Sequence, residues 1–262
     1  MKKIALALTY DGRNYSGWQI QRNAKTVQEY LESALSIVAN ETVTVSCAGR
    51  TDAGVHATVQ IVSFESGADR SLNQWLQGGN TNLPKDIRIQ WLKEVDSIFH
   101  ARFKALERHY CYVINNTNVA PCILRKLVTW HIKPLNSEAM HNAAQALVGK
   151  HDFSSFRSSS CQANTAIRHV KNITVRRLED SNTIVLKICA NAFLHHMVRN
   201  IVGSLLRVGE GTHDHNWLQL VLEAKDRAQA SITAPADGLY LTGVIYPEHF
   251  ELPSEVVKPP ML

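Results

Sequence analysis

Residues 48–57 hold the side chains best suited to chemistry. The stretch reads Ala-Gly-Arg-Thr-Asp-Ala-Gly-Val-His-Ala and places Asp52 two residues after Arg50, between Gly49 and Gly54. A carboxylate close to a guanidinium stays ionised, and an ionised carboxylate suits a nucleophile better than a general acid. Aspartate and glycine are also common in turns, and the residue types alone favour a simple turn.

The runs on either side of this stretch predict strands. Apolar residues alternate with polar ones over 42–47, and β-branched and aromatic residues dominate 58–64. We therefore expect residues 48–57 to form a loop between two strands, with its glycines supplying backbone freedom.

The pattern of the first half predicts the β-α-β-β-α-β order of a ferredoxin-like fold. Thr26 and Glu29 predict a capping box for the first helix. Besides the two strands around the loop, the expected elements are a strand over 4–10, helices over 27–39 and 72–76, a turn over 80–84 and a strand over 87–95.

The second half also mixes helices with antiparallel strands, so the fold class expected is α+β. A boundary near residue 105 divides the chain into 1–105 and 106–262. The expected elements are strands over 108–114, 170–178, 183–190 and 239–246, a turn over 179–182, helices over 137–148 (capped by Ser137), 195–208 and 217–224, and a polar loop over 151–165.

Composition narrows the class of protein. The 262 residues carry a net charge of +5, which permits a polyanionic partner but is explained equally by solubility. The five cysteines are scattered without a C-x-x-C pair, which excludes a disulfide framework and predicts reduced thiols in a cytoplasmic protein. No apolar run approaches the length of a membrane span.

No cofactor or metal is expected. The chain has no dinucleotide-binding glycine motif, no Walker loop and no H-E-x-x-H. His195 and His196 are predicted to point apart on a helix, and His213 to His215 read as a solvated loop.

The segment 11–25 has two readings. Tyr15 and Trp18 stand among arginine, lysine and glutamine residues, a mixture that suits contact with bases and phosphates. The same two aromatic rings are equally able to pack the loop onto the body of the protein.

The stretch 48–57 resembles the signature of the TruA family of tRNA pseudouridine synthases. Other segments resemble the family in the right order, over nearly the whole chain: Tyr10-Asp11-Gly12, Tyr15-Ser16-Gly17-Trp18-Gln19, Phe99-His100-Ala101-Arg102-Phe103, Arg108-His109-Tyr110 and the run from His195 to Gly203.

The resemblance implies roles for five residues. Asp52 matches the family's nucleophile, and whether it attacks C6 of the base or C1′ of the ribose is not readable from sequence. Tyr110 matches the tyrosine that lies against the target base, and Arg199 an arginine that pairs with the catalytic carboxylate. Arg50 is a candidate to contact the nucleotide's phosphate or to fill the space that the nucleotide vacates. Leu241 is a candidate for an apolar wall of the pocket. A strand-core tyrosine and a surface arginine are the plain alternatives for Tyr110 and Arg199.

The resemblance also implies an architecture and a substrate. It implies two ferredoxin-like halves with antiparallel sheets joined side by side, helices on one face and a basic cleft on the other. The half 1–105 would carry the catalytic loop and 106–262 would complete the cleft of a homodimer. The implied substrates are uridines 38, 39 and 40 of the tRNA anticodon stem-loop. Candidate phosphate contacts are Arg22, Lys25, Arg102, Lys104, Arg157 and Arg168.

Three rival functions stand beside this one. A non-catalytic RNA-binding protein would keep the fold but has no use for a carboxylate facing phosphates. A pseudouridine synthase for another RNA site would share every motif. A hydrolase using Asp52 as a base lacks a partner acid or metal.

Overall fold

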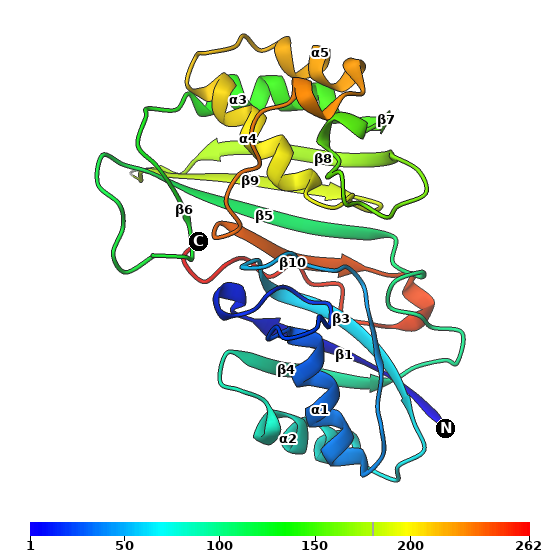
Figure 1. Ribbon diagram of the computed structural model, residues 1–262. Helices are drawn as coiled ribbons and strands as arrows, with labels where there is room; N and C mark the ends of the chain where they lie inside the picture. The colour runs from blue at the N-terminus through cyan, green and yellow to red at the C-terminus, as the bar shows by residue number, and fades with distance from the viewer. Residues whose placement is uncertain (180) are drawn as a thin grey trace. The chain divides into compact units, whose positions relative to one another are not determined.

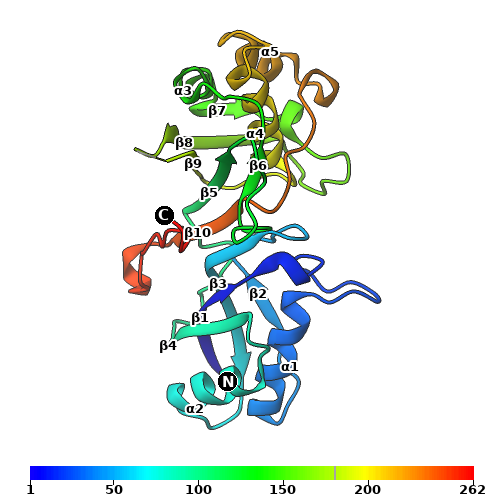
Figure 2. The same cartoon turned by 90° about the vertical axis from the view of Figure 1, so that its left-hand side faces the viewer.

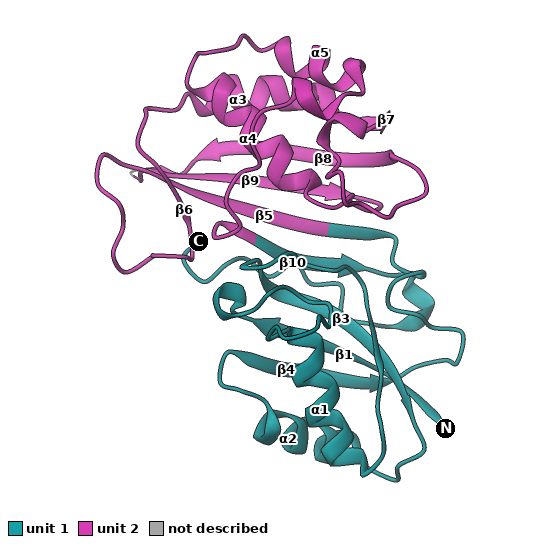
Figure 3. Cartoon of the chain, viewed as in Figure 1, with its two compact units in different colours: residues 1–108, 240–262 teal, residues 109–239 magenta. Residues whose placement is uncertain are grey.

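The computed structural model describes residues 1–179 and 181–262, and the chain falls into two compact units. Unit 1 comprises residues 1–108 and 240–262, and unit 2 comprises 109–239 (Figure 3). Both units combine mostly antiparallel strands with helices, which confirms the α+β class. No helix of the described residues is long and apolar enough to cross a membrane.

The sheet of unit 1 is built around β1 (Lys2–Tyr10), which pairs antiparallel with β4 (Ile87–Glu94) on one edge and with β3 (His56–Ser66) on the other. Two short strands share the far edge of β3. The strand β2 (Val45–Cys47), labelled in Figure 2, pairs with the second half of β3. The strand β10 (Leu239–Ile245) pairs parallel with the first two residues of β3 (Figure 1). The strand predicted over 42–47 is therefore shorter in the structure, where it covers Val45–Cys47.

Two helices of unit 1 pack against each other, α1 (Val27–Ala39) and α2 (Leu72–Asn82). The bounds of α1 are as predicted, but the predicted capping box is absent: Thr26 is fully buried and its side chain makes no cap hydrogen bond. The capping box of this unit belongs to α2, between Ser71 and Gln74. The helix α2 extends to Asn82, so it is longer than the helix predicted over 72–76, and the turn predicted over 80–84 is wrong.

In unit 2 the strands run in the order β5 (Glu107–Asn116), β9 (Thr183–Ala190), β8 (Ile167–Arg177) and β7 (Gly149–Asp152), with β6 (Thr129–His131) beside β5. The predicted turn between β8 and β9 includes Asp180, which lies outside the described residues. Neither β6 nor β7 was predicted, because a strand of three or four residues is too short to show a period.

The helices α3 (Ser137–Ala144), α4 (Met197–Gly209) and α5 (Trp217–Ala224) pack together in unit 2 (Figure 2). Three predictions for these helices are wrong. The helix predicted over 137–148 ends at Ala144 and is followed by a 3-10 turn over Gln145–Leu147. The cap of α3 is Asn136, whose Oδ1 accepts from the N–H groups of Glu138 and Ala139 at 3.0 Å, and not Ser137. The helix α4 begins two residues later than predicted, because His196 has a left-handed backbone (φ +63°).

Backbone packing fixes the position of α4. A Cβ added at Gly203 would lie 1.9 Å from the carbonyl oxygen of Ile232, so only glycine allows this close approach. One turn earlier, the Ala234 N–H donates to the carbonyl of Arg199 at 3.1 Å, and the Arg199 Nε donates to the carbonyl of Ala234 at 2.8 Å. The segment 232–234 therefore holds the helix that carries Arg199.

We predict that Gly203→Ala destabilises the protein by about 1–3 kcal/mol, because the added methyl group forces α4 away from Ile232. Urea unfolding measures the change. Gly67→Ala is the matched control, since a Cβ there would meet only a side-chain oxygen of Glu41 at 3.8 Å. Equal stability of the two variants would contradict the packing argument.

Candidate active site

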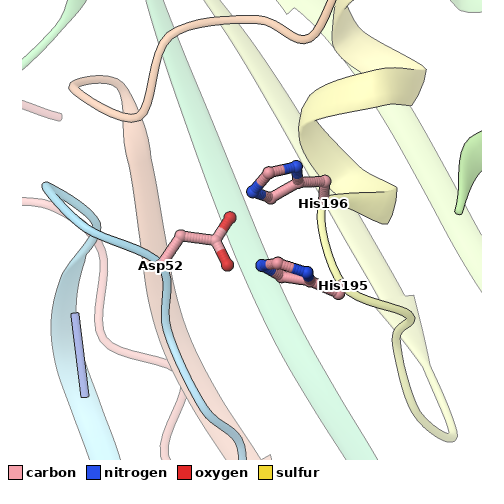
Figure 4. Close-up of side chains that lie close together, drawn as sticks. All are labelled: Asp52, His195 and His196. Carbon is pink, nitrogen blue, oxygen red and sulfur yellow. The ribbon is translucent and has the colours of Figure 1, made fainter. Parts of the chain in front are cut away.

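A loop connects β2 to β3, as the sequence predicted, but it covers 48–55 and not 48–57, because β3 begins at His56. Asp52 projects from this loop half-buried (Figure 4). Its centre is held by the segment that follows β1. The Trp18 N–H donates to the carbonyl of Thr51 at 3.0 Å, and the Gly54 N–H donates to the carbonyl of Tyr15 at 3.2 Å. The backbone on both sides of Asp52 is therefore tied to one neighbouring segment.

A buried side-chain contact reinforces this tie. The hydroxyl groups of Tyr10 and Thr51 lie 2.7 Å apart, and both side chains are largely excluded from water. Hydrogen bonds between buried groups are costly to leave unmade, about 1–3 kcal/mol for each unsatisfied partner. Thr51 immediately precedes Asp52, so this contact fixes the backbone from which the carboxylate projects.

Gly17 permits the close approach of the two segments. Its φ is +92°, and a Cβ there would lie 2.7 Å from the carbonyl oxygen of Thr51. Tyr15 and Trp18 on either side of it are 7% and 2% exposed. Of the two readings of segment 11–25, the structure supports packing for these two aromatic rings.

The beginning of the loop is held separately by two long polar side chains. The Arg108 guanidinium donates to the carbonyl of Ala48 at 3.0 Å, and also to the carbonyls of Arg102 and Ala105 at 2.6 and 3.0 Å. The Gln60 side chain donates to the carbonyl of Gly49 at 2.5 Å. A guanidinium can donate to several carbonyl groups at once through its planar set of N–H groups, a geometry that a lysine ammonium does not have.

The end of the loop leads into a buried histidine, His56. The Gly12 N–H donates to its Nδ1 at 3.0 Å, and the Asp11 carboxylate lies 3.1 Å from the same nitrogen. Its ring stacks on Tyr240, with centroids 4.7 Å apart. Burial raises the pKa of Asp11, but the close contacts of its carboxylate with His56 and Arg13 outweigh burial and hold that pKa well below its usual range.

Positive charge gathers at the beginning of the loop. Arg50 is exposed, and the neighbouring Cys47 is half-buried. Burial raises the pKa of this thiol to about 12 against the positive charges of Arg50 and Arg102, which lower it. Leu241 lies on β10, fully buried, opposite Ala57 in the pairing with β3.

Unit 2 carries the other two candidate residues. Tyr110 lies on β5, is 8% exposed, and meets the edge of Phe193 with ring centroids 5.0 Å apart. Arg199 is half-buried on α4, with its Nε bound to the carbonyl of Ala234.

The expectation for His195 and His196 needs correction. Both precede α4 instead of lying within it, and their rings face each other with centroids 4.0 Å apart (Figure 4). The left-handed backbone of His196 brings the two rings together, so the argument that neighbouring helix residues point apart does not apply.

Comparison with known proteins decides the family. A family model described as "tRNA pseudouridine synthase" matches residues 6–104 and 143–247. The chain belongs to the tRNA pseudouridine synthase family. The first matched range includes the loop with Asp52, while Tyr110 falls between the two matched ranges.

Named members of the family are similar over nearly their full length. A protein of Cronobacter sakazakii called tRNA pseudouridine synthase A is 53% identical over 99% of this chain and 94% of its own length. Its namesake in Coxiella burnetii is 49% identical over 99% and 98%. A solved structure described as "Structure of H/ACA RNP bound to a substrate RNA containing 2'-deoxyuridine" is 11% identical over 78% of this chain and 44% of its own, with a TM-score of 0.37. So weak a likeness carries no inference.

Sequence reasoning missed the groups that hold the loop. Tyr10, Gln60 and Arg108 are separated from their partners by 41, 11 and 60 positions. The family motifs include Tyr10 and Arg108 but do not state that they contact the loop.

We predict that Tyr10→Phe lowers the free energy of unfolding by about 1–3 kcal/mol and slows catalysis, because the Thr51 hydroxyl loses its partner. Denaturant unfolding and single-turnover rates measure the two effects. In a double-mutant cycle with Thr51→Val, the two single losses should not add. Additive losses would show that the Tyr10–Thr51 hydrogen bond is not what matters.

Proposed function

We propose that the protein isomerises uridine to pseudouridine at positions 38, 39 and 40 of the tRNA anticodon stem-loop. The observation that carries this proposal is Asp52, on a loop of the family's sequence whose backbone is tied on both sides. Family membership supports isomerase chemistry on tRNA. The exact uridines rest on the resemblance of the motifs.

The reaction exchanges one bond to the base for another. The N1–C1′ glycosidic bond breaks, the base turns, and a C5–C1′ bond forms. The proton leaves C5 and a proton is gained at N1, so substrate and product are isomers. We assign to Asp52 the role of nucleophile, by attack at C6 or at C1′, because either route needs an ionised carboxylate in a fixed position.

We assign substrate-binding roles to four further residues. The Tyr110 ring would stack on uracil, and its phenol group would serve hydrogen bonding or proton transfer at C5. Arg199 would pair with the catalytic carboxylate and Arg50 with a phosphate, because a guanidinium binds both groups bidentately. Leu241 would contribute an apolar wall. In this scheme 1–105 carries the catalytic loop and 106–262 completes the cleft.

A stacked and paired uridine must first leave the helix. Base extrusion costs a few kcal/mol, which phosphate contacts and stacking in the pocket offset. We propose that basic residues supply these contacts: Arg22, Lys25, Arg102, Lys104, Arg157 and Arg168.

We further propose a cytoplasmic homodimer that acts without a cofactor. The five cysteines are free thiols in the structure, as expected of a protein in a reducing compartment. Sedimentation velocity of the wild-type protein tests the dimer, and a monomer at micromolar concentration would contradict it.

We predict that wild-type protein releases tritium from unmodified tRNA carrying C5-tritiated uridine, and that Asp52→Asn releases none. The amide keeps the shape of the side chain but removes the nucleophilic charge. Asp69→Asn is the matched control, because it neutralises an exposed carboxylate of the same unit. Equal release by wild type and Asp52→Asn would show that Asp52 is not the nucleophile.

We predict that the affinity for tRNA falls as salt rises, because each neutralised phosphate releases counterions. The slope of log K against log salt should be about −0.9 for each phosphate contacted. Filter binding over about 50–300 mM KCl measures the slope. A salt-independent affinity would contradict a tRNA substrate.

A further inference from the structure

An exposed aromatic residue in a basic setting lies on the segment that joins β4 to β5. Phe103 is 72% exposed, and the neighbouring Arg102 and Lys104 are also exposed. A phenylalanine this exposed gains little stability from burial. Most of the ring is therefore accessible to a partner molecule.

The setting of the ring is that of a nucleic-acid contact. The Arg102 guanidinium carbon lies 5.5 Å from the centroid of the Phe103 ring, and the His100 ring lies 4.3 Å from it. Stacked aromatic and cationic groups are the means by which proteins bind unpaired bases, while the positive charges bind phosphates.

The backbone beneath these side chains is anchored. Ala101 is fully buried: its N–H donates to the Ser63 hydroxyl at 3.2 Å, and its carbonyl accepts from the Tyr246 hydroxyl at 2.6 Å. The Lys104 N–H donates to the carbonyl of His100 at 3.0 Å. The exposed ring is therefore presented by a fixed turn, which lowers the entropy cost of binding.

This turn is also connected to the catalytic loop. Arg108 donates at once to the carbonyl of Arg102 and to that of Ala48, where the loop begins. Arg50 on the loop and Arg102 on the turn are both exposed, so each of these connected segments presents a positive charge to solvent.

We propose that His100, Arg102, Phe103 and Lys104 form an RNA platform, in which Phe103 stacks on an unpaired base and Arg102 and Lys104 bind the adjoining phosphates. The platform rests on the proposed function, since it names the surface by which the enzyme holds its RNA. Base stacking needs a flat ring, whereas an apolar protein partner would accept any side chain of similar size.

The experiment separates stacking from simple apolar contact. Binding of an unmodified tRNA transcript is measured across a salt series for Phe103→Ala, Phe103→Leu and Phe103→Trp. We expect Ala and Leu to weaken binding by about 5- to 150-fold, without a change in the salt slope, and Trp to preserve it. Arg102→Gln and Lys104→Gln should each lower the slope by about 0.7–0.9.

Ile98→Ala is the matched control, because Ile98 is 60% exposed on the same segment but lies outside the platform. It should bind tRNA as wild type does, and thermal unfolding should show all variants folded. Wild-type affinity in Phe103→Ala or in Phe103→Leu would overturn the platform. A changed sedimentation coefficient in Phe103→Ala would overturn it in favour of a contact with a second copy.

The platform and the proposed function fail differently. If wild type binds tRNA but releases no tritium, the isomerase proposal fails while the Phe103 variants still test the platform. If wild type releases tritium and the Phe103→Ala variant binds equally well, only the platform fails.

Discussion

The backbone of residues 48–55 is held by hydrogen bonds from several other segments of unit 1, and the chemistry depends on this constraint. If the loop were flexible, part of the substrate-binding energy would be needed to order its carboxylate. Here the carbonyls of Ala48 and Thr51 accept from Arg108 and Trp18, and the Tyr10 hydroxyl meets that of Thr51. The carboxylate of Asp52 therefore projects from a backbone that the fold has already fixed.

The same principle applies to the residue carried by α4. Arg199 exchanges hydrogen bonds with Ala234, and Gly203 lets the helix contact the same segment directly. Backbone-to-backbone contact leaves little room for adjustment, since interiors are close-packed. In each unit, a glycine required by close packing thus lies near a candidate site residue: Gly17 beside Asp52, and Gly203 one turn from Arg199.

The spacing of side chains along the sequence predicted the elements whose formation depends on neighbouring residues. Both ends of α1 and of α5 were predicted correctly, because apolar side chains at helical spacing mark the face by which a helix packs on the core. The capping box predicted at Thr26 was wrong, because the fold buries that side chain and it makes no cap hydrogen bond. The start of α4 was wrong because the left-handed residue there is a histidine, a conformation that sequence rarely reveals. Asp52 was found through its ten-residue string, whereas its distant supports required the fold.

We propose that this chain makes pseudouridine in the tRNA anticodon stem-loop with Asp52 as its nucleophile. The most direct test maps pseudouridine at single-nucleotide resolution in tRNA from cells lacking the protein, complemented with wild type or with Asp52→Asn. Pseudouridine should appear at positions 38, 39 and 40 with wild type, and unmodified uridine should remain there with the variant. Modification restored by both proteins, or restored by wild type only at other positions, would contradict it.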